Sequence, residues 1–383
     1  MSRRVLFAVT HLLGTGHLAR TALIAGALAR RGVDVVLASG GMPVPGLDPG
    51  PARLVQLPPL RAADATFARL LDAEGRDADE GLFARRRQAL QGALGDARPH
   101  VVVVEQYPFG RRKLAREFAA LLAAARALGP PAVTVGSVRD VLTAQSDPAR
   151  LAAMAERARA ELDAVMVHGD PRLIPFEASF PPAPSIADRL VYTGYVAAAP
   201  VPRRAGGPGE GEIVVSAGGG AVGAPLYRAA LGAARVVPGV TWRVLVGRGT
   251  AWRPAEVPGN AIVEPNRADF RALLANCRVS VSQGGYNTVV DVLAARARGV
   301  IVPFAADGQT EQTLRASRLA ARGLVELLDE SVLAPASLAA AVRRALTAPK
   351  PDVAAVALDG ADTSAALLET WATLGHADLE RAR

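Results

Sequence analysis

Two glycine-rich loops in the second half of the chain have the composition of phosphate-binding turns. Residues 216–223 read SAGGGAVG, and residues 282–287 read SQGGYN. Each loop follows a short β-branched run and precedes a stretch with helical spacing, and Asn287 is a candidate N-cap for the second helix. Backbone amides at a helix N-terminus favour anions, because their N–H groups are unpaired and the helix dipole is positive there. Glycine-rich turns also arise from close packing alone, so both interpretations stay open for each loop.

A histidine follows a third glycine-containing loop, near the N-terminus. Residues 14–17 read GTGH, between a buried-type strand at residues 5–10 and a helix that begins at His17. An imidazole at this transition can take a proton from an acceptor hydroxyl, or from water, near neutral pH. A lone histidine in this position is as easily a helix cap or a core residue, and His11 is a weaker rival for the base.

The same loop matches the dinucleotide-binding fingerprint GxGxxA through Gly14, Gly16 and Ala19. That fingerprint also requires an acidic residue at the end of the second strand, where it binds the ribose. The strand predicted at residues 33–38 is followed by Ser-Gly, and Asp34 lies at its start. NAD binding is therefore a minority interpretation.

The elements that position these residues form two α/β domains. Apolar strands alternate with helical stretches, an order typical of parallel sheets, which bind ligands at the carboxyl ends of their strands. Residues 197–211 have the composition of a linker. The sequence thus predicts an N-terminal domain at residues 1–196, a C-terminal domain at 212–360 and a last helix at 361–383 that could return to the first domain.

Several local predictions concern the first domain. Residues 40–59, rich in Pro and Gly, predict a long specificity loop, and residues 61–96 predict a mostly helical stretch. Asp77-Ala78-Asp79 has the form of a metal-binding DxD motif, but a solvated face is the favoured interpretation. For Arg111-Arg112-Lys113, a solvated helix end is favoured slightly over a patch for a membrane surface or an acceptor phosphate. Ser137 and His168 each follow a predicted strand.

Composition and charge narrow the class of protein. The chain has 383 residues, half of them hydrophobic, which suits two domains with separate cores. A net charge of +8 could favour nucleic acid, an anionic membrane or a phosphorylated substrate, but no nucleic-acid-binding pattern accompanies it, so nucleic acid is ranked low. Cys277 is the only cysteine, which excludes an internal disulfide and suits a reducing compartment. No apolar run reaches the roughly 20 residues that span a bilayer, so a cytoplasmic location is expected.

A set of residues around the second glycine loop carries a family resemblance. Its members are Ser282, Gly284, Gly285, Thr288 and Asp291, with Pro303-Phe304 and Glu311-Gln312 downstream. They resemble the donor-binding half of GT-B glycosyltransferases, and within that class most resemble glycosyltransferase family 28, to which the MurG enzymes belong. The resemblance implies a GT-B fold of the α/β class, in which two doubly wound Rossmann-like parallel-sheet domains face a cleft. The first domain would bind the acceptor and the second the nucleotide sugar.

The resemblance also implies roles for individual residues. Asp291 stands where the family has an acidic residue, usually Glu, that holds the ribose hydroxyls of the donor; a carboxylate can accept both. The residues implied in binding the donor diphosphate are Gly14, Gly16, Ser216, Gly218, Gly219, Gly220, Ser282, Gly284, Gly285, Tyr286 and Asn287. Those implied in binding the nucleoside are Asn266, Arg267, Phe270 and Asp291. Glu311 and Gln312 would bind the sugar hydroxyls.

The N-terminal loop extends the resemblance to the first domain. A GxGH sequence with an arginine three residues later, here Arg20, is found in family 28 and in the related PseG-type hydrolases. With the donor domain beside it, this motif makes His17 the favoured base, and Glu105, after the strand at residues 101–104, the group that would orient it. The resemblance implies an inverting, metal-independent transferase that uses a UDP-linked hexose or N-acetylhexosamine as donor substrate and needs no cofactor.

The acceptor and the reaction itself leave alternatives open. A glycan, a lipid-linked molecule and a small molecule all remain candidate acceptors, and the basic cluster permits peripheral contact with the inner face of the membrane. The nearest alternative is a nucleotide-sugar hydrolase or epimerase on the same scaffold, although the loop at residues 40–59 weakly favours a large acceptor over water. A non-catalytic nucleotide-sugar-binding protein is the alternative of a different class, and it predicts that His17→Ala leaves the main activity intact.

Overall fold

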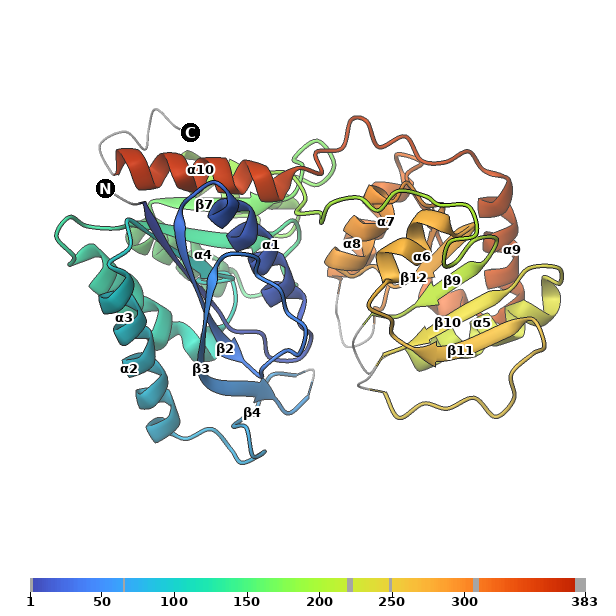
Figure 1. Cartoon of the computed structure of the whole chain (residues 1–383), viewed down its shortest axis with the longest axis horizontal. Helices are drawn as coiled ribbons and strands as arrows, with labels where there is room; N and C mark the ends of the chain where they lie inside the picture. The colour runs from blue at the N-terminus through green and yellow to red at the C-terminus, as the bar shows by residue number, and fades with distance from the viewer. Residues whose placement is uncertain (1–2, 65, 219–222, 248–249, 306–309, 376–383) are drawn as a thin grey trace. The chain divides into compact units, whose positions relative to one another are not determined.

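The computed structural model describes residues 3–64, 66–218, 223–247, 250–305 and 310–375, and within them the chain forms two compact units (Figure 1). The first unit combines Met1–Val196 with Asp359–Arg383, and the second is Ala197–Leu358. Each unit is built on its own β-sheet with helices packed against it.

The first unit has a sheet whose described strands run in the order β4-β3-β2-β1-β5-β6-β7-β8. Among these strands, only the pairing of β3 with β4 is antiparallel. The bounds are β1 Arg4–Val9, β2 Asp34–Gly41, β3 Arg53–Ala62, β4 Leu70–Leu71, β5 Val101–Glu105, β6 Val133–Arg139, β7 Ala164–His168 and β8 Leu190–Tyr192. The central strands are almost wholly buried, as expected for parallel strands with helices on both faces.

Helices cover both faces of this sheet. They are α1 Gly16–Arg30, α2 Glu80–Ala97, α3 Ala115–Arg126, α4 Pro148–Glu161 and α10 Gly360–Leu374, with the short 3-10 helices η1 Arg112–Leu114, η2 Phe176–Ala178 and η3 Ala183–Arg189. One hydrophobic cluster joins Leu6 and Ala8 of β1 to α2, α3 and α4, and another joins Val5 and Phe7 to α1 and α10. Alternate residues of one strand therefore serve opposite faces, as the two-residue period of a strand requires.

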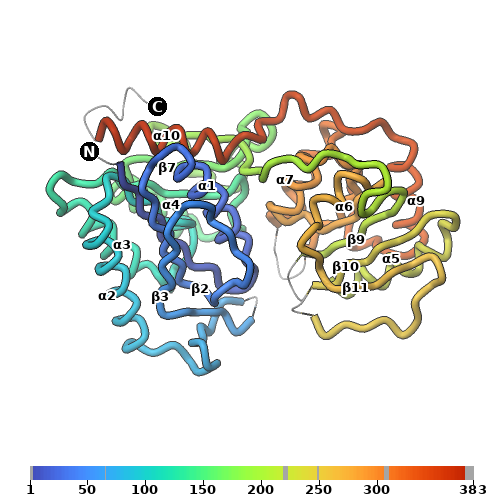
Figure 2. The backbone as a smooth tube through the Cα atoms, in the orientation of Figure 1, coloured from blue at the N-terminus to red at the C-terminus, as the bar shows by residue number. Residues whose placement is uncertain are grey.

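The last described helix, α10, packs on the first unit beside α1 (Figure 2). Its Trp371 and Leu368 are fully buried, and Glu369 accepts a hydrogen bond from Arg31 Nε at 2.6 Å. The chain enters α10 at Gly360, where an added Cβ would lie 2.4 Å from the carbonyl oxygen of Gly194. Close backbone contact at this point explains the glycine.

The second unit has a sheet whose described strands, all parallel, run in the order β11-β10-β9-β12-β13-β14. The strands are β9 Ile213–Ser216, β10 Trp242–Val246, β11 Ala261–Pro265, β12 Val279–Ser282, β13 Gly299–Ile301 and β14 Glu326–Leu327. The helices are α5 Ala224–Val236, α6 Phe270–Asn276, α7 Tyr286–Ala294, α8 Glu311–Ala320 and α9 Pro335–Thr347, with the 3-10 helix η5 Glu330–Val332.

Two predictions for the first unit are wrong. Residues 40–59 are not one long loop, because β3 begins at Arg53, and residues 61–96 are helical only from Glu80 onward. The strand was hidden by Pro58 and Pro59, which lie where the β2–β3 register shifts and the ladder is interrupted, a place where proline is tolerated. Residues 40–59 therefore no longer favour a large acceptor over water.

The DxD-like segment has local partners of its own. Asp79 caps α2, since its carboxylate accepts a hydrogen bond from Leu82 N at 2.7 Å. Asp77 forms an exposed ion pair with Arg69 at 2.9 Å.

In the described parts of the chain, no helix combines the length and the apolar character needed to cross a membrane.

Candidate functional site

Four polar residues from separate elements meet at the carboxyl edge of the first sheet. His17 lies in the first turn of α1, after β1, whereas Glu105 and His168 end β5 and β7. Ser137, in β6, lies in register with Glu105. The strand order reverses between β1 and β5, and such switch points are where open α/β sheets bind ligands.

A chain of hydrogen bonds joins these residues. Nδ1 of His17 lies 2.8 Å from Oε1 of Glu105, and Oγ of Ser137 donates to Oε2 of Glu105 at 2.5 Å. Ser137 Oγ also lies 2.9 Å from Nε2 of His168, whose Nδ1 lies 2.8 Å from Oγ1 of Thr193. Because the Ser137 hydroxyl gives its single proton to Glu105, it must accept from His168. Except for His17, all members of this hydrogen-bond network are buried, so the network fixes the Glu105 carboxylate in place.

Glu105 is ionised, and this sets the protonation of His17. Burial raises the pKa of Glu105, but the ion pair with Arg20 and the hydrogen bonds from His17 and Ser137 outweigh it and hold the pKa at about 2. An ionised carboxylate can only accept hydrogen bonds, so His17 donates from Nδ1. Its Nε2 therefore carries the lone pair.

The imidazole of His17 is neutral near pH 7. Burial, followed by the positive charge of Arg111, lowers the pKa of His17 to about 3, against the opposing effect of Glu105. The side chain is still 17% exposed, so a substrate can reach it. When His17 accepts a proton, the adjacent carboxylate stabilises the imidazolium that forms.

A second group of polar residues lies at the carboxyl edge of the second sheet. Ser216 and Ser282 end β9 and β12, and they are paired in register at the point where the strand order reverses. Ser216 Oγ accepts from Gly218 N at 3.2 Å, and Asn266 Nδ2 donates to Gly218 O at 3.1 Å. Among the described residues, Ser282 Oγ and Asn266 Oδ1 have no hydrogen-bond partner although both atoms are buried. Each atom therefore lacks a hydrogen bond within the described structure.

Helix α8 holds the second glycine turn in place. Arg315, fully buried, donates from Nη1 to Gly284 O at 2.7 Å and lies over the ring of Tyr286, 5.8 Å from its centroid. A Cβ on Gly284 would lie 3.0 Å from the carbonyl oxygen of Gln312, whose own Oε1 accepts from Phe304 N at 3.1 Å. Contacts from helix α8 therefore fix the glycine turn at Gly284.

The contacts of Arg315 were not predicted from the sequence, and one predicted helix cap is wrong. The available signal for Arg315 was its position three residues after Gln312 on α8, which places both residues on one helix face. Asn287 is not an N-cap, because α7 begins at Tyr286 and has Gly285 in the cap position without a side-chain cap.

Asp291, on α7, is a half-buried carboxylate with no hydrogen-bond or ion-pair partner among the described residues. Burial raises its pKa to about 6, and only the charge of Arg271 opposes this shift. A desolvated, unpaired carboxylate is unfavourable for folding, and such groups are concentrated at binding sites. Ligand hydroxyls would supply the missing hydrogen bonds.

Residues 260–361 match the model of the glycosyltransferase family 28 C-terminal domain. This match lies mostly within the second unit. It confirms the resemblance to family 28 that the sequence predicts and supports a glycosyltransferase. No curated protein matches the sequence.

Solved structures of glycosyltransferases share the whole fold. CalG4, the calicheamicin glycosyltransferase, is 20% identical with a TM-score of 0.60, over 100% of this chain and 98% of its own. MurG of Acinetobacter baumannii is 14% identical with a TM-score of 0.57, over 97% and 99%. The spinosyn rhamnosyltransferase SpnG, complexed with thymidine diphosphate, is 18% identical with a TM-score of 0.58, over 97% and 96%. At these identities the likeness shows the fold, and it confirms the predicted GT-B architecture.

The remaining predicted site residues of this glycosyltransferase lie in varied surroundings. Gly219 and Gly220 lie outside the described residues. Gly14 is exposed in the first unit and Gly16 begins α1. The other three are Glu311, which begins α8, Arg267, which is paired with Asp269 at 2.6 Å, and Phe270, which packs against a hydrophobic cluster. Arg267 and Phe270 are thus engaged in contacts within the second unit.

In the described ranges, no group of three or more His, Cys, Asp and Glu side chains could hold a metal ion.

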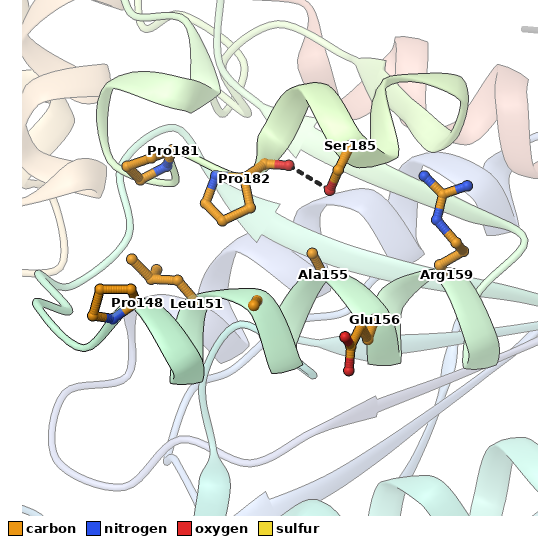
Figure 3. Close-up of a pocket in the computed structure, with 9 residues that line it drawn as sticks. Pro148, Leu151, Ala155, Glu156, Arg159, Pro181, Pro182 and Ser185 are labelled. Carbon is orange, nitrogen blue, oxygen red and sulfur yellow. Dashed lines mark hydrogen bonds between the residues drawn. The ribbon is translucent and has the colours of Figure 1, made fainter.

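A groove of about 490 Å³ in the first unit is separate from these residues (Figure 3). It lies between α4 and residues 181–185, and its lining is mostly apolar. Ser185 at its wall already donates to the carbonyl oxygen of Pro182 at 2.7 Å. None of the predicted site residues lines it, so it is not part of the candidate site.

We expect Asp291→Asn to stabilise the protein by about 1 kcal/mol at about pH 8, after allowing for partial exposure. The folded state raises the pKa of this carboxyl. Folding is therefore penalised at every pH at which the Asp291 carboxyl of the unfolded chain is ionised. The gain should therefore shrink as the pH falls from about 6 towards 3.8, the ordinary pKa of an aspartate carboxyl. Denaturant unfolding across this pH range, with the exposed Asp352→Asn as control, measures it. An equal gain in both variants would contradict the argument.

Proposed function

We propose that this glycosyltransferase moves a hexose or N-acetylhexosamine from a UDP- or dTDP-linked sugar to an acceptor hydroxyl, with inversion and without a metal ion. The observation that carries the proposal is the His17–Glu105 pair, with a contact of 2.8 Å, at the switch point of the first sheet. The dTDP option is supported by SpnG, whose structure holds thymidine diphosphate. The UDP option rests on the family resemblance.

The second unit would bind the donor. Backbone amides after β9 and β12, with the N-terminus of α7, would hold the diphosphate, and the unpartnered hydroxyl of Ser282 would add a hydrogen bond. Asp291 would accept the ribose hydroxyls, which explains an otherwise unpaired carboxylate. Glu311 and Gln312 would bind the hydroxyls of the transferred sugar.

Transfer requires one proton movement, one new bond and one broken bond. The acceptor hydroxyl gives its proton to Nε2 of His17, and its oxygen forms a bond to the anomeric carbon. The bond from that carbon to the β-phosphate oxygen breaks, and its electron pair leaves with the nucleoside diphosphate. Attack from the opposite face inverts the configuration. Glu105 stabilises the imidazolium, and loop amides stabilise the leaving diphosphate.

A hydrolase that activates water with the same base is the nearest alternative, and a panel of donors separates the two. The purified chain is incubated with UDP- and dTDP-linked sugars, with and without a cell extract that supplies acceptors. Free nucleoside diphosphate and free sugar are measured in parallel. We expect negligible release until the extract is added, and weaker donor binding in Asp291→Ala. Rapid release of free sugar or of a sugar monophosphate without acceptor would contradict transfer and favour hydrolysis.

A cytoplasmic location, with peripheral contact to the inner face of the membrane, is also part of the proposal. Its support is the buried free thiol of Cys277, which suits a reducing compartment, and the exposed basic side chains of Arg112 and Lys113. Co-sedimentation with anionic and neutral vesicles tests the membrane contact, and equal recovery with both would contradict it.

A further inference from the structure

Arg111 is a cation beside His17 that has no anionic partner in the described structure. Arg20, the other arginine close to His17, is paired with Glu105. The guanidinium of Arg111 forms no ion pair with a described residue, and its Nε is buried without a hydrogen-bond acceptor. Its charge nevertheless acts on both His17 and Glu105. A partly buried charge without a counterion is unfavourable unless a ligand supplies one.

Charges of both signs act on Arg111. Burial lowers its pKa to about 10 against the attraction of Glu105, which is the largest charge effect, and the charges of Arg139 and Arg20 lower the pKa further. The guanidinium is still charged near pH 7. Because Glu105 is already paired with Arg20 and hydrogen-bonded to Ser137 and His17, its charge is shared among several partners. Glu105 therefore does not serve Arg111 alone.

The loop that carries Arg111 has a second unpaired donor. Gln106 is 6% exposed, and its Nε2 is buried without an acceptor among the described residues. Gln106 and Arg111 both adopt left-handed backbone conformations, with φ of 68° and 58°, which non-glycine residues rarely use. Such strain persists where the surroundings impose it, and it is concentrated at binding sites. Residues 106–111 thus contain two buried donors without acceptors among the described residues, Nε2 of Gln106 and Nε of Arg111.

We propose that residues 106–111 bind an anionic group of the acceptor, a phosphate or a carboxylate, through Arg111. This inference rests on the proposed transfer reaction, and it adds that the acceptor carries negative charge close to the hydroxyl that is glycosylated. The anion would do more than hold the acceptor. By neutralising Arg111 it would remove a charge that now makes His17 less basic, so the bound acceptor would strengthen the base that attacks it.

Titration of the full chain with inorganic phosphate and with acetate, at constant ionic strength, tests the site. Binding is followed by calorimetry and by the imidazole NMR signal of His17, which His17→Gln identifies. We expect saturable phosphate or acetate binding in the millimolar range with a rise in the pKa of His17. Arg111→Gln should weaken binding at least about tenfold, whereas the exposed neighbour Arg112→Gln should change it by less than about twofold. The anion that binds more tightly identifies the class of acceptor group.

The variants also separate a binding defect from a folding defect. Arg111→Lys keeps the charge and should recover part of the anion affinity, which a merely structural role for Arg111 would not predict. No saturable response of His17 to either anion in the wild type, or equal loss in Arg111→Gln and Arg112→Gln, would overturn the proposal.

A third titration, with UDP and with dTDP, assigns the anion site to acceptor or donor. Arg111→Gln should leave nucleotide affinity unchanged; a matching loss of nucleotide affinity would assign Arg111 to the donor diphosphate and overturn the acceptor assignment. Failure of the proposed function has a different outcome. A wild-type chain that turns over no nucleotide sugar contradicts transfer, while the phosphate and acetate titrations still report on Arg111.

Discussion

Replacing His17 by alanine is expected to lower the rate of glycosyl transfer by about 10²–10⁴-fold and to leave donor affinity within about twofold. The rate should fall because the proposed mechanism uses His17, with the buried carboxylate of Glu105 beside it, to take the acceptor proton. Donor affinity is preserved because the proposed ribose-binding and sugar-binding residues belong to the other unit. Single-turnover release of nucleoside diphosphate, and calorimetry with the donor, measure the two quantities separately.

Two other histidines of the first unit serve as comparisons. His100 lies before β5, at the opposite end of the sheet, where its Nδ1 accepts from Arg4 N at 3.1 Å, so His100→Ala should retain the wild-type rate. His11 is the rival base, and its buried Nδ1 lacks a partner among the described residues. If His11→Ala removes activity and His17→Ala does not, the base has been assigned to the wrong residue. A full transfer rate in both variants would place the base at another residue, whereas nucleotide-sugar binding without any transfer by the wild type would favour a non-catalytic binding protein.

The pH dependence of the rate follows from the same geometry. Only neutral His17 can accept the proton, and its lowered pKa of about 3 keeps it neutral above that pH. Loss of the rate from protonation of His17 is therefore expected only as the pH falls towards about 3. Donor affinity should weaken earlier, as Asp291 is protonated below about pH 6. Protonation of His17 therefore lowers the rate constant, whereas protonation of Asp291 raises the donor Kd, so the two effects are measured separately.

The polar edge of the second sheet could be predicted from the sequence because its signals are local. Ser216 and Ser282 each follow a short β-branched run, and parallel pairing brings the ends of such runs to one edge of a sheet. The glycines that follow are recognisable as strand-to-helix turns. Even so, the contacts that fix these turns were not predictable, since Arg315 acts from a helix about thirty residues away, and no local pattern links it to Gly284.

The polar cluster of the first sheet depended more on strand order, which local patterns do not specify. Ser137 and His168 could each be placed at the end of a strand, but their hydrogen bonds exist only because β5, β6 and β7 are neighbours. The pairing of His17 with Glu105 crosses the switch point between β1 and β5. Strand β3 was missed because its two prolines resemble a loop when strand pairing is unknown.

Glu105→Gln is expected to destabilise the protein by about 3 kcal/mol near neutral pH and to slow transfer by at least about tenfold. The substitution leaves the buried guanidinium of Arg20 without its counterion. It also removes the charge that stabilises protonated His17. Denaturant unfolding and the single-turnover rate measure the two effects, and the exposed Glu156→Gln is the control for a change of charge alone.

The dependence of this stability on pH distinguishes an ion pair from simple packing. The folded state lowers the pKa of Glu105 from its ordinary value of 4.5 to about 2, so its stabilising effect is fully present above pH 4.5 and is lost as the pH falls through about 2. The difference between wild type and Glu105→Gln should therefore narrow in acid. The double variant Arg20→Leu with Glu105→Leu should lose less unfolding free energy than the two single variants lose in sum. Each single variant leaves one buried charge unpaired, whereas the double variant leaves none. Strict additivity would show that the pair contributes through shape and not through charge, and Glu105 would then have no electrostatic role in supporting His17.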